Sequence, residues 1–366
     1  MVIYFILAII VTLITIYSIR FNEKSQKILY VSTAILMTLI IIVRDSTVNK
    51  DYGIYKQLYD KAPALSVLKN SYSEYNDKLI TEASYSMLCT VLKETENSDK
   101  TNFIIIFAIY AIIGVAIKTI AIRRTSDLPF LALFTYFCNI YLLQEMTQIR
   151  AGIALGFVLL SIKDLYDRKY WLFFLWIFIA AFFHTSAFMA LVLIFFREIK
   201  ADRRVWGTIF LICVIINITQ FDILNLIKII PFEFYQYKLK AYILLQDRAD
   251  FKINYFNISF ILQNVIIIIC FFYKKLLEEK CQYVNILLNM CCLSSCCFVF
   301  FGQIPGFAFR ISELFNISLI FLIPQLAKVM TPKYIGQLIV ISIGWILFLI
   351  NVLHSGLLQP YKTFWS

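Results

Sequence analysis

Charged residues, glycine and proline are all scarce in this 366-residue chain. Only 16% of its residues are charged and 61% are hydrophobic, whereas a soluble globular domain carries about 25% charged and about 45–50% apolar residues. Long apolar runs recur over the whole length, which excludes a soluble enzyme with a single membrane anchor. The 10 glycines and 7 prolines argue mildly against a transporter, because transporters expose backbone at the membrane midplane through helices that these residues interrupt. The composition predicts an all-α polytopic membrane protein.

The chain also lacks the motifs of several enzyme classes. It has no Gly-rich phosphate loop, HExxH motif or nucleophile elbow. No DxD-like acidic pair lies in a predicted cytoplasmic loop, so a sugar nucleotide bound through a metal is unsupported. The nine cysteines include one dense group, which we interpret as small residues packed between helices, because no His or carboxylate accompanies it. We expect neither a metal nor another cofactor. The group consists of Cys291, Cys292, Cys296 and Cys297.

Apolar segments long enough to cross a membrane, which takes about 20 residues, follow one another along the chain. The basic connection 20–27 is predicted to be cytoplasmic, which places the N-terminus outside. We interpret 170–196 as a buried helical hairpin with a turn near His184–Ser186, because a single helix there would put the basic segment 197–204 outside. The candidate spans are 1–19, 28–43, 102–122, 128–146, 147–165, 170–196, 205–220, 253–273, 281–301, 311–330 and 336–356.

These spans give about 11–12 membrane helices, with both termini outside. The net charge of +11 then lies mainly on the cytoplasmic side, so it orients the chain in the membrane and does not indicate nucleic acid. We expect one transmembrane domain, 1–366, with a large outer loop, 44–101, between the second and third spans. Mixed apolar and basic residues in 221–252 predict a second outer segment that lies on the membrane interface.

Ionisable groups at the ends of membrane helices are costly, so each is a candidate for function. On the predicted outer side, three arginines suit a diphosphate, because a guanidinium offers paired donors at fixed charge. Local pairing is the alternative for two of them, Arg150 with Glu145 and Arg310 with Glu313. Arg44 could instead simply mark the end of a helix. The candidate substrate-binding residues at this face are Arg44, Gln148, Arg150 and Arg310.

A general base is the second chemical requirement that the outer face can meet. His184, in IAAFFHTSAF, is either such a base or a hydrogen-bonded structural group. Asp51 and Glu82 in the outer loop are the candidate carboxylates, with a plain surface position as the alternative for each. Tyr52, Tyr55 and Tyr59 recur on one helical face of DYGIYKQLYD. Their rings suit stacking against sugars, or packing against the membrane domain.

Four patches, in this order and spacing, resemble the EpsG-like branch of Wzy-type polymerases, which join polysaccharide repeat units in bacterial envelopes. The patches span residues 44–315, and QIRAGIA followed by FFHTSAF is the most specific pair. The chain departs from the family pattern at Asn49 and Lys50, where Gly and Thr are usual, and at Ala83-Ser84, where Pro-Gly is usual. The patches are RDSTVNKDYGIYKQLY (44–59), EASYSML (82–88), QIRAGIA (148–154) with FFHTSAF (182–188), and FRISELF (309–315).

The resemblance implies a glycosyltransferase of the bacterial cytoplasmic membrane that acts on O-antigen, capsule or exopolysaccharide units. The growing glycan would move from its undecaprenyl diphosphate carrier to a hydroxyl of the next lipid-linked oligosaccharide, at the outer face. The outer arginines would hold the diphosphate, and His184, Asp51 or Glu82 would accept the hydroxyl proton. Membrane lipids surround both substrates, and a chain-length regulator and a flippase are candidate protein partners. A ligase that uses the same donor, and a flippase or exporter of the lipid-linked glycan, are the alternative functions.

Overall fold

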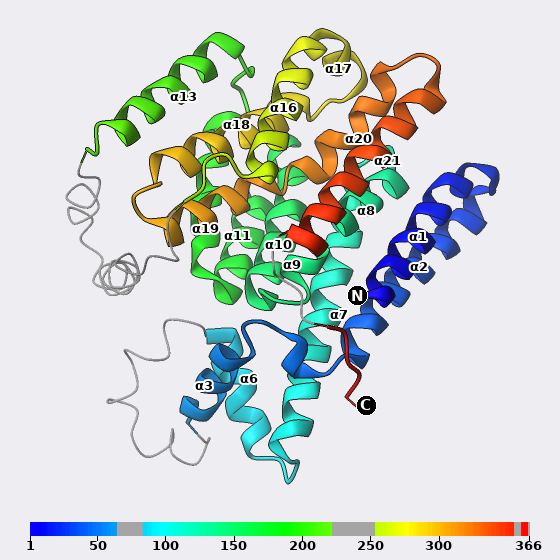
Figure 1. Ribbon diagram of the computed structural model, residues 1–366, viewed down its shortest axis with the longest axis vertical. Helices are drawn as coiled ribbons and strands as arrows, with labels where there is room; N and C mark the ends of the chain where they lie inside the picture. The colour runs from blue at the N-terminus through cyan, green and yellow to red at the C-terminus, as the bar shows by residue number, and fades with distance from the viewer. Residues whose placement is uncertain (64–82, 222–252, 355–359, 365–366) are drawn as a thin grey trace. The chain divides into compact units, whose positions relative to one another are not determined.

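The computed structural model describes residues 1–63, 83–221, 253–354 and 360–364 (Figure 1). In these residues the regular structure is helical, apart from one isolated bridge between Arg44 and Thr363. The chain divides into two compact units, Met1–Phe188 with Leu326–Ser366, and Met189–Gln325. The predicted interfacial segment 221–252 lies, except for its first residue, outside the described residues.

Several helices of the described part are long and apolar enough to cross a membrane, which confirms the class of multi-pass membrane protein. Four pass this test singly, and up to six pass it if each of two bent pairs is one span. This is fewer than the predicted 11–12, because several predicted spans are shorter helices. Two of the four are single helices, α2 (Glu23–Val43) and α7 (Asp99–Thr125). The other two are Val2–Arg20, which contains α1 (Val2–Tyr17), and Lys333–Leu353, which contains α21 (Lys333–Leu349).

Of the two bent pairs, the first bends at the end of the predicted span 253–273, and the second bends inside the predicted span 311–330, which is therefore not one straight helix. The first, α16 (Ile258–Phe272) and α17 (Lys274–Lys280), bends by 80° where the apolar run meets KKLLEEK. The second, α19 (Pro305–Asn316) and α20 (Leu319–Val329), bends by 45°. Proline at the first position of α19 starts that helix earlier than predicted, since proline is pre-organised for a first turn.

The first unit is built around α7 and α10 (Ile149–Tyr166), which pack on each other. A Cβ atom on Gly156 would lie 2.9 Å from Ile117 Cγ2 of α7. The absence of a side chain at Gly156 therefore allows α10 to approach α7 closely. Between these two helices the chain forms α8 (Pro129–Tyr136), a π-helical turn, Phe137–Tyr141, and α9 (Leu142–Gln144).

The segment 170–196 breaks at His184, where we predicted a turn. Helix α11 (Tyr170–Phe183) ends there, and the 3-10 helix η4 (Thr185–Val192) and α12 (Leu193–Phe196) follow. His184 itself is extended, with φ −152° and ψ 117°. The return of the second arm to the cytoplasmic side stays a prediction, because the two arms belong to different units.

One end of the first unit collects segments that the sequence assigns to the outer side. The backbone N–H of Asp45, just after α2, donates to the Lys362 carbonyl over 2.8 Å. Near the two termini, the rings of Tyr4 and Tyr361 lie 5.8 Å apart. Lys100, in the first turn of α7, donates to the Phe364 carbonyl over 3.3 Å. The end of α2, the start of α7 and both terminal segments therefore share one end of this unit, and its position outside the membrane stays a prediction.

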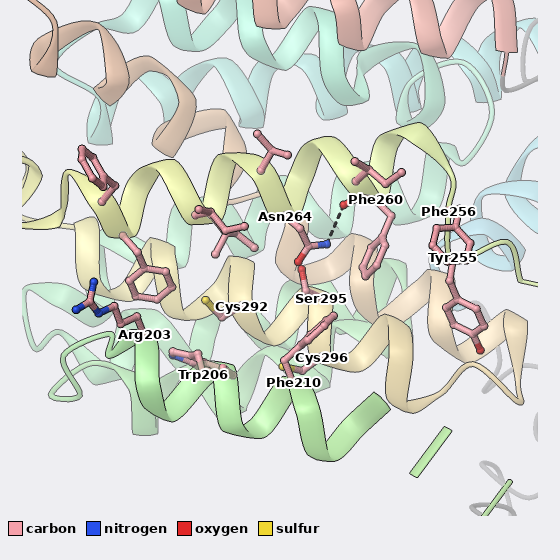
Figure 2. Close-up of a pocket in the computed structure, with 17 residues that line it drawn as sticks. Arg203, Trp206, Phe210, Tyr255, Phe256, Phe260, Asn264, Cys292, Ser295 and Cys296 are labelled. Carbon is pink, nitrogen blue, oxygen red and sulfur yellow. Dashed lines mark hydrogen bonds between the residues drawn. The ribbon is translucent and has the colours of Figure 1, made fainter. Parts of the chain in front are cut away.

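In the second unit, α13 (Arg203–Ile218) and α16 both pack on α18 (Val284–Phe300), as Figure 2 shows. The Gln263 side chain fastens α16 to α18 by donating to the Ser294 and Ser295 hydroxyls, over 3.0 and 3.1 Å. Hydrogen bonds of this kind stabilise contacts between membrane helices. The clustered cysteines of α18 are free and mostly buried. No group of three or more His, Cys, Asp or Glu in the described part of the chain is placed to hold a metal ion.

Candidate active site

The predicted outer loop, 44–101, contributes two helices that pack on the start of α7 and that we call the outer helices. They are α3 (Tyr52–Lys61) and α6 (Ala83–Lys93). The rings of Tyr55 and Tyr59 point inward and are each 2% exposed, as the packing alternative expects. Tyr52 lies at the edge of the same face and is half-buried, with its ring 5.4 Å from that of Phe103. Of these three tyrosines, Tyr52 therefore keeps the most surface for a sugar.

Arg44 lies beneath the short turn 145–148, which joins α9 to α10. Its guanidinium donates to the Met146 carbonyl over 2.5 Å and to the Glu145 carbonyl over 3.4 Å. The side chain is 4% exposed and lies over the Phe107 ring of α7, 5.7 Å from its centroid. Arg44 therefore does more than mark the end of α2, because it fixes the turn that starts α10. Its predicted contact with an anion stays a prediction.

Arg150 lies in the first turn of α10, beside the two buried tyrosines of the outer helices. Its guanidinium carbon is 5.2 Å from the Tyr55 ring centroid and 5.8 Å from that of Tyr85. The Tyr85 hydroxyl donates to the Tyr55 carbonyl over 3.1 Å, and the Tyr55 hydroxyl donates to the Thr147 carbonyl over 3.3 Å. Three distant segments therefore meet at the turn. We call Arg44, Tyr55, Tyr85 and Arg150 the arginine–tyrosine cluster.

The start of α10 adds to the positive potential that Arg150 provides. Gln148 is the N-cap residue of α10, and its carbonyl accepts the first bond of the helix, from the Gly152 N–H over 2.8 Å. The first N–H groups of a helix attract anions. Both Gln148 and Arg150 are half-buried. These two predicted residues therefore lie together at one partly exposed position that suits a negatively charged group.

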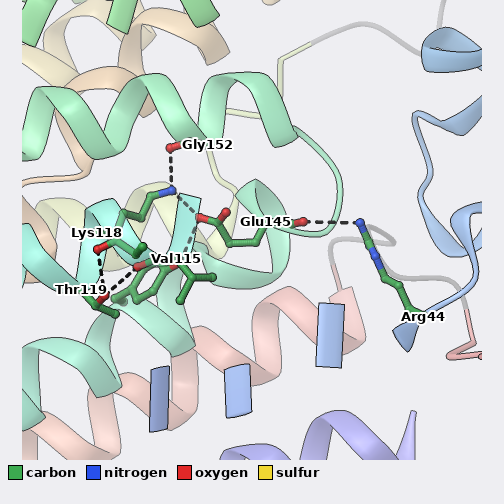
Figure 3. A network of polar contacts seen from close by, with 8 residues as sticks. Arg44, Val115, Lys118, Thr119, Glu145 and Gly152 are labelled. Atoms are coloured by element: carbon green, nitrogen blue, oxygen red, sulfur yellow. Dashed lines mark hydrogen bonds and ion pairs between the residues drawn. The ribbon is translucent and has the colours of Figure 1, made fainter. Parts of the chain in front are cut away.

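An ion pair that the sequence analysis missed lies on the far side of the turn (Figure 3). Lys118 of α7 pairs with Glu145, and the side chains are 0% and 1% exposed. Lys118 also donates to the Gly152 carbonyl over 2.6 Å, and the Tyr136 hydroxyl donates to Glu145 over 2.9 Å. The carboxylate that the sequence analysis offered as a local partner of Arg150 thus pairs with Lys118. The sequence did contain a signal for this ion pair, a lysine inside the apolar run of α7, because a charged residue in a membrane helix is costly without a partner.

Two of the three candidate bases lie on described elements that border the cluster. Asp51 directly precedes α3 and is half-buried. His184 follows Phe183, whose ring packs 6.1 Å from that of Tyr110. Tyr110 in turn packs 6.0 Å from the Tyr85 ring. Glu82 lies outside the described residues, immediately before α6.

Arg310 belongs to the second unit, where it lies on α19 and is half-buried. The neighbouring Phe309 packs against Phe298 of α18, with ring centroids 5.6 Å apart. This places Arg310 near the C-terminal end of α18. Its predicted contact with the same anion as Arg150 stays a prediction.

Burial keeps the phenols of the outer helices neutral. It raises the pKa of Tyr85 far above its ordinary value, with a further contribution from Cys89, and it also raises the pKa of Tyr59. Both hydroxyls therefore stay protonated at neutral pH. Asp45 behaves differently, because hydrogen bonds from the Thr47 hydroxyl and N–H outweigh the effect of its partial burial and lower its pKa. An ionised carboxylate therefore lies next to Arg44 in sequence.

Comparison with known proteins identifies one family. A protein-family model described as EpsG family matches residues 27–363, which is nearly the whole chain and includes both units. No curated protein and no solved structure gives a significant match.

Proposed function

The chain belongs to the EpsG family, whose members are Wzy-like polysaccharide polymerases, and from this premise we propose the reaction that it catalyses. The enzyme transfers a growing glycan from undecaprenyl diphosphate to a hydroxyl of the next lipid-linked repeat unit. The reaction takes place at the outer face of the bacterial cytoplasmic membrane. The observation that carries the proposal is the meeting of Arg44, Tyr55 and Tyr85 with Arg150 at the turn before α10.

Stabilisation of the leaving diphosphate is the first task of the site. The bond between the anomeric carbon and the diphosphate oxygen breaks, and negative charge develops on that oxygen. Arg150 and the start of α10 supply fixed positive charge at one position, which favours a transition state with more negative charge than the substrate. Arg44 acts through the turn that it holds. Arg310 is the second guanidinium that we assign to the diphosphate.

Activation of the acceptor hydroxyl is the second task. The hydroxyl oxygen forms the new bond to the anomeric carbon, and its proton passes to a base within hydrogen-bond reach. Asp51 and His184 are half-buried groups on elements that border the cluster, and Glu82 is the third candidate. Tyr52 is the aromatic ring that we assign to the sugar, because it is the most exposed of the three tyrosines on α3.

A gel of cell-surface glycan from a strain without this gene tests the proposal beside the parent strain. Loss of polymerisation leaves single repeat units on the surface acceptor, because export and ligation continue. Lipid-linked polymer that accumulates outside, with a bare acceptor, would identify a ligase instead. Lipid-linked units that stay inside would identify a flippase and would refute the proposal.

A further inference from the structure

The second unit contains a groove between α13 and α16, with α18 as its floor (Figure 2). Its volume is about 680 Å³, and all the residues that line it belong to this unit. Aromatic and aliphatic side chains form most of its wall. They include Trp206, Phe210, Phe260, Ile268 and Phe271.

The groove suits a hydrocarbon chain because the polar groups in its wall are already satisfied. The Asn264 amide donates to the Phe260 carbonyl of its own helix over 2.8 Å, as Figure 2 shows. The hydroxyl of Ser295 accepts a hydrogen bond from Gln263. At Gly207 the wall has no side chain, and a Cβ atom there would meet nothing within 4 Å. An apolar chain can therefore fill the space without leaving a donor or acceptor unmatched.

Arg203 lies at one end of the groove and is exposed. Among the described residues no carboxylate lies within 4.0 Å of its guanidinium. Two acidic residues of this unit, Asp202 and Glu278, interact with other groups. Asp202 accepts from the Arg204 and Val205 N–H groups, over 2.7 and 3.1 Å, and so caps α13. Glu278 pairs with Lys274 over 3.3 Å. A phospholipid requires an apolar surface for its acyl chain and a positive group for its phosphate. The groove offers the first in its wall and the second in the Arg203 guanidinium.

This end of the groove is distinct from the end of α18 that carries Arg310. The N-terminal part of α18 is level with Arg203, since the Trp206 indole donates to Asn289 over 2.8 Å. Arg310 follows Phe309, which packs on Phe298 near the other end of α18. Asn289 and Phe298 are nine positions apart, which corresponds to about 13.5 Å along the helix. The phosphate that we place at Arg203 therefore lies apart from the diphosphate that we assign to Arg310.

We infer that the groove between α13 and α16 binds an acyl chain of an anionic membrane phospholipid, with the lipid phosphate on Arg203. The predicted topology puts Arg203 on the cytoplasmic side, where anionic lipids attract basic residues. Helices α13 and α16 both pack on α18 and have few contacts with each other. The bound acyl chain fills the space between them. The phospholipid thus forms part of the packing of this unit.

Native mass spectrometry of the full-length protein tests the inference. The protein is released from detergent micelles that contain equal amounts of phosphatidylglycerol and phosphatidylcholine with identical acyl chains. The wild-type protein should retain phosphatidylglycerol preferentially. Arg203→Gln should reduce that preference about fivefold, the ratio expected for one basic residue near a membrane surface. Arg204→Gln, one residue along and outside the groove, is the matched control and should keep the preference.

A second pair of variants tests the acyl chain itself. Gly207→Phe should fill the groove and release both lipids. Ile212→Phe, on an exposed side of α13 that does not line the groove, should retain them. Both variants must elute from a sizing column as the wild-type protein does. Equal retention of the two lipids by the wild type, an unchanged preference in Arg203→Gln, or replacement of phosphatidylglycerol by added undecaprenyl phosphate would overturn the inference. None of these readouts depends on polymerisation.

Discussion

Replacement of Glu145 by glutamine tests how the turn before α10 is held in place. The change keeps the shape of the side chain but leaves the Lys118 ammonium with no carboxylate, at a position with 0% exposure. Removal of one partner from a buried ion pair costs about 3–5 kcal/mol, because the other charge stays buried. For a unit of this size, this corresponds to a fall in Tm of roughly 6–20 °C. The Lys118→Met/Glu145→Gln double variant should recover most of this loss, since it buries no charge.

Thermal unfolding of the purified protein in detergent measures the effect. The matched control is Asp127→Asn, which breaks the ion pair between Lys328 and Asp127. That pair is 2.8 Å long, but its carboxylate side chain is 71% exposed. An exposed ion pair contributes about 0–1 kcal/mol, so the control should melt close to the wild type. A wild-type Tm for Glu145→Gln would refute the reasoning. A double variant no more stable than Glu145→Gln would refute it equally.

Four further predictions concern the site. Arg150→Ala and Arg310→Ala should each abolish polymer on a glycan gel at normal protein levels in the membrane, whereas Arg123→Ala, an exposed arginine at the other end of α7, should not. Among His184→Gln, Asp51→Asn and Glu82→Gln, one variant should lose the acidic limb of the pH–rate profile, the fall in rate at low pH that protonation of the wild-type base causes; if all three keep wild-type profiles, the base lies elsewhere. Tyr55→Phe should lower the free energy of unfolding by about 1 kcal/mol, since it loses the hydrogen bond to the Thr147 carbonyl, and an unchanged Tm would contradict that contact. Cys89 should resist a maleimide at pH 8 in the folded protein and react after denaturation, because burial raises the pKa of its thiol to about 12; labelling of the folded protein would contradict this burial.

The sequence predicted the features that depend on local pattern. The break at His184 follows from an apolar run too long for one crossing, and the inward face of α3 follows from the spacing of its tyrosines. Each of these features can be derived from residues within a few turns of one another.

The contacts that build the site depend on tertiary structure, and pattern alone did not give them. Arg44 donates to the Met146 carbonyl 102 residues later, and Lys118 pairs with Glu145 from a neighbouring helix, so no local spacing encodes either contact. The bend between α19 and α20 also escaped the hydropathy pattern, because both arms are apolar. The lysine inside α7 was visible in the sequence, but its partner was not.

Reconstitution of the purified protein in liposomes tests the central claim most directly. The liposomes contain the undecaprenyl-diphosphate-linked repeat unit, and the assay follows glycan length and released undecaprenyl diphosphate together. The wild-type protein should form a ladder of polymer and release one carrier diphosphate for each new linkage, and Arg150→Ala should do neither. Polymer of normal length from Arg150→Ala, or a wild-type protein that moves the lipid-linked unit across the bilayer without lengthening it, would contradict the account.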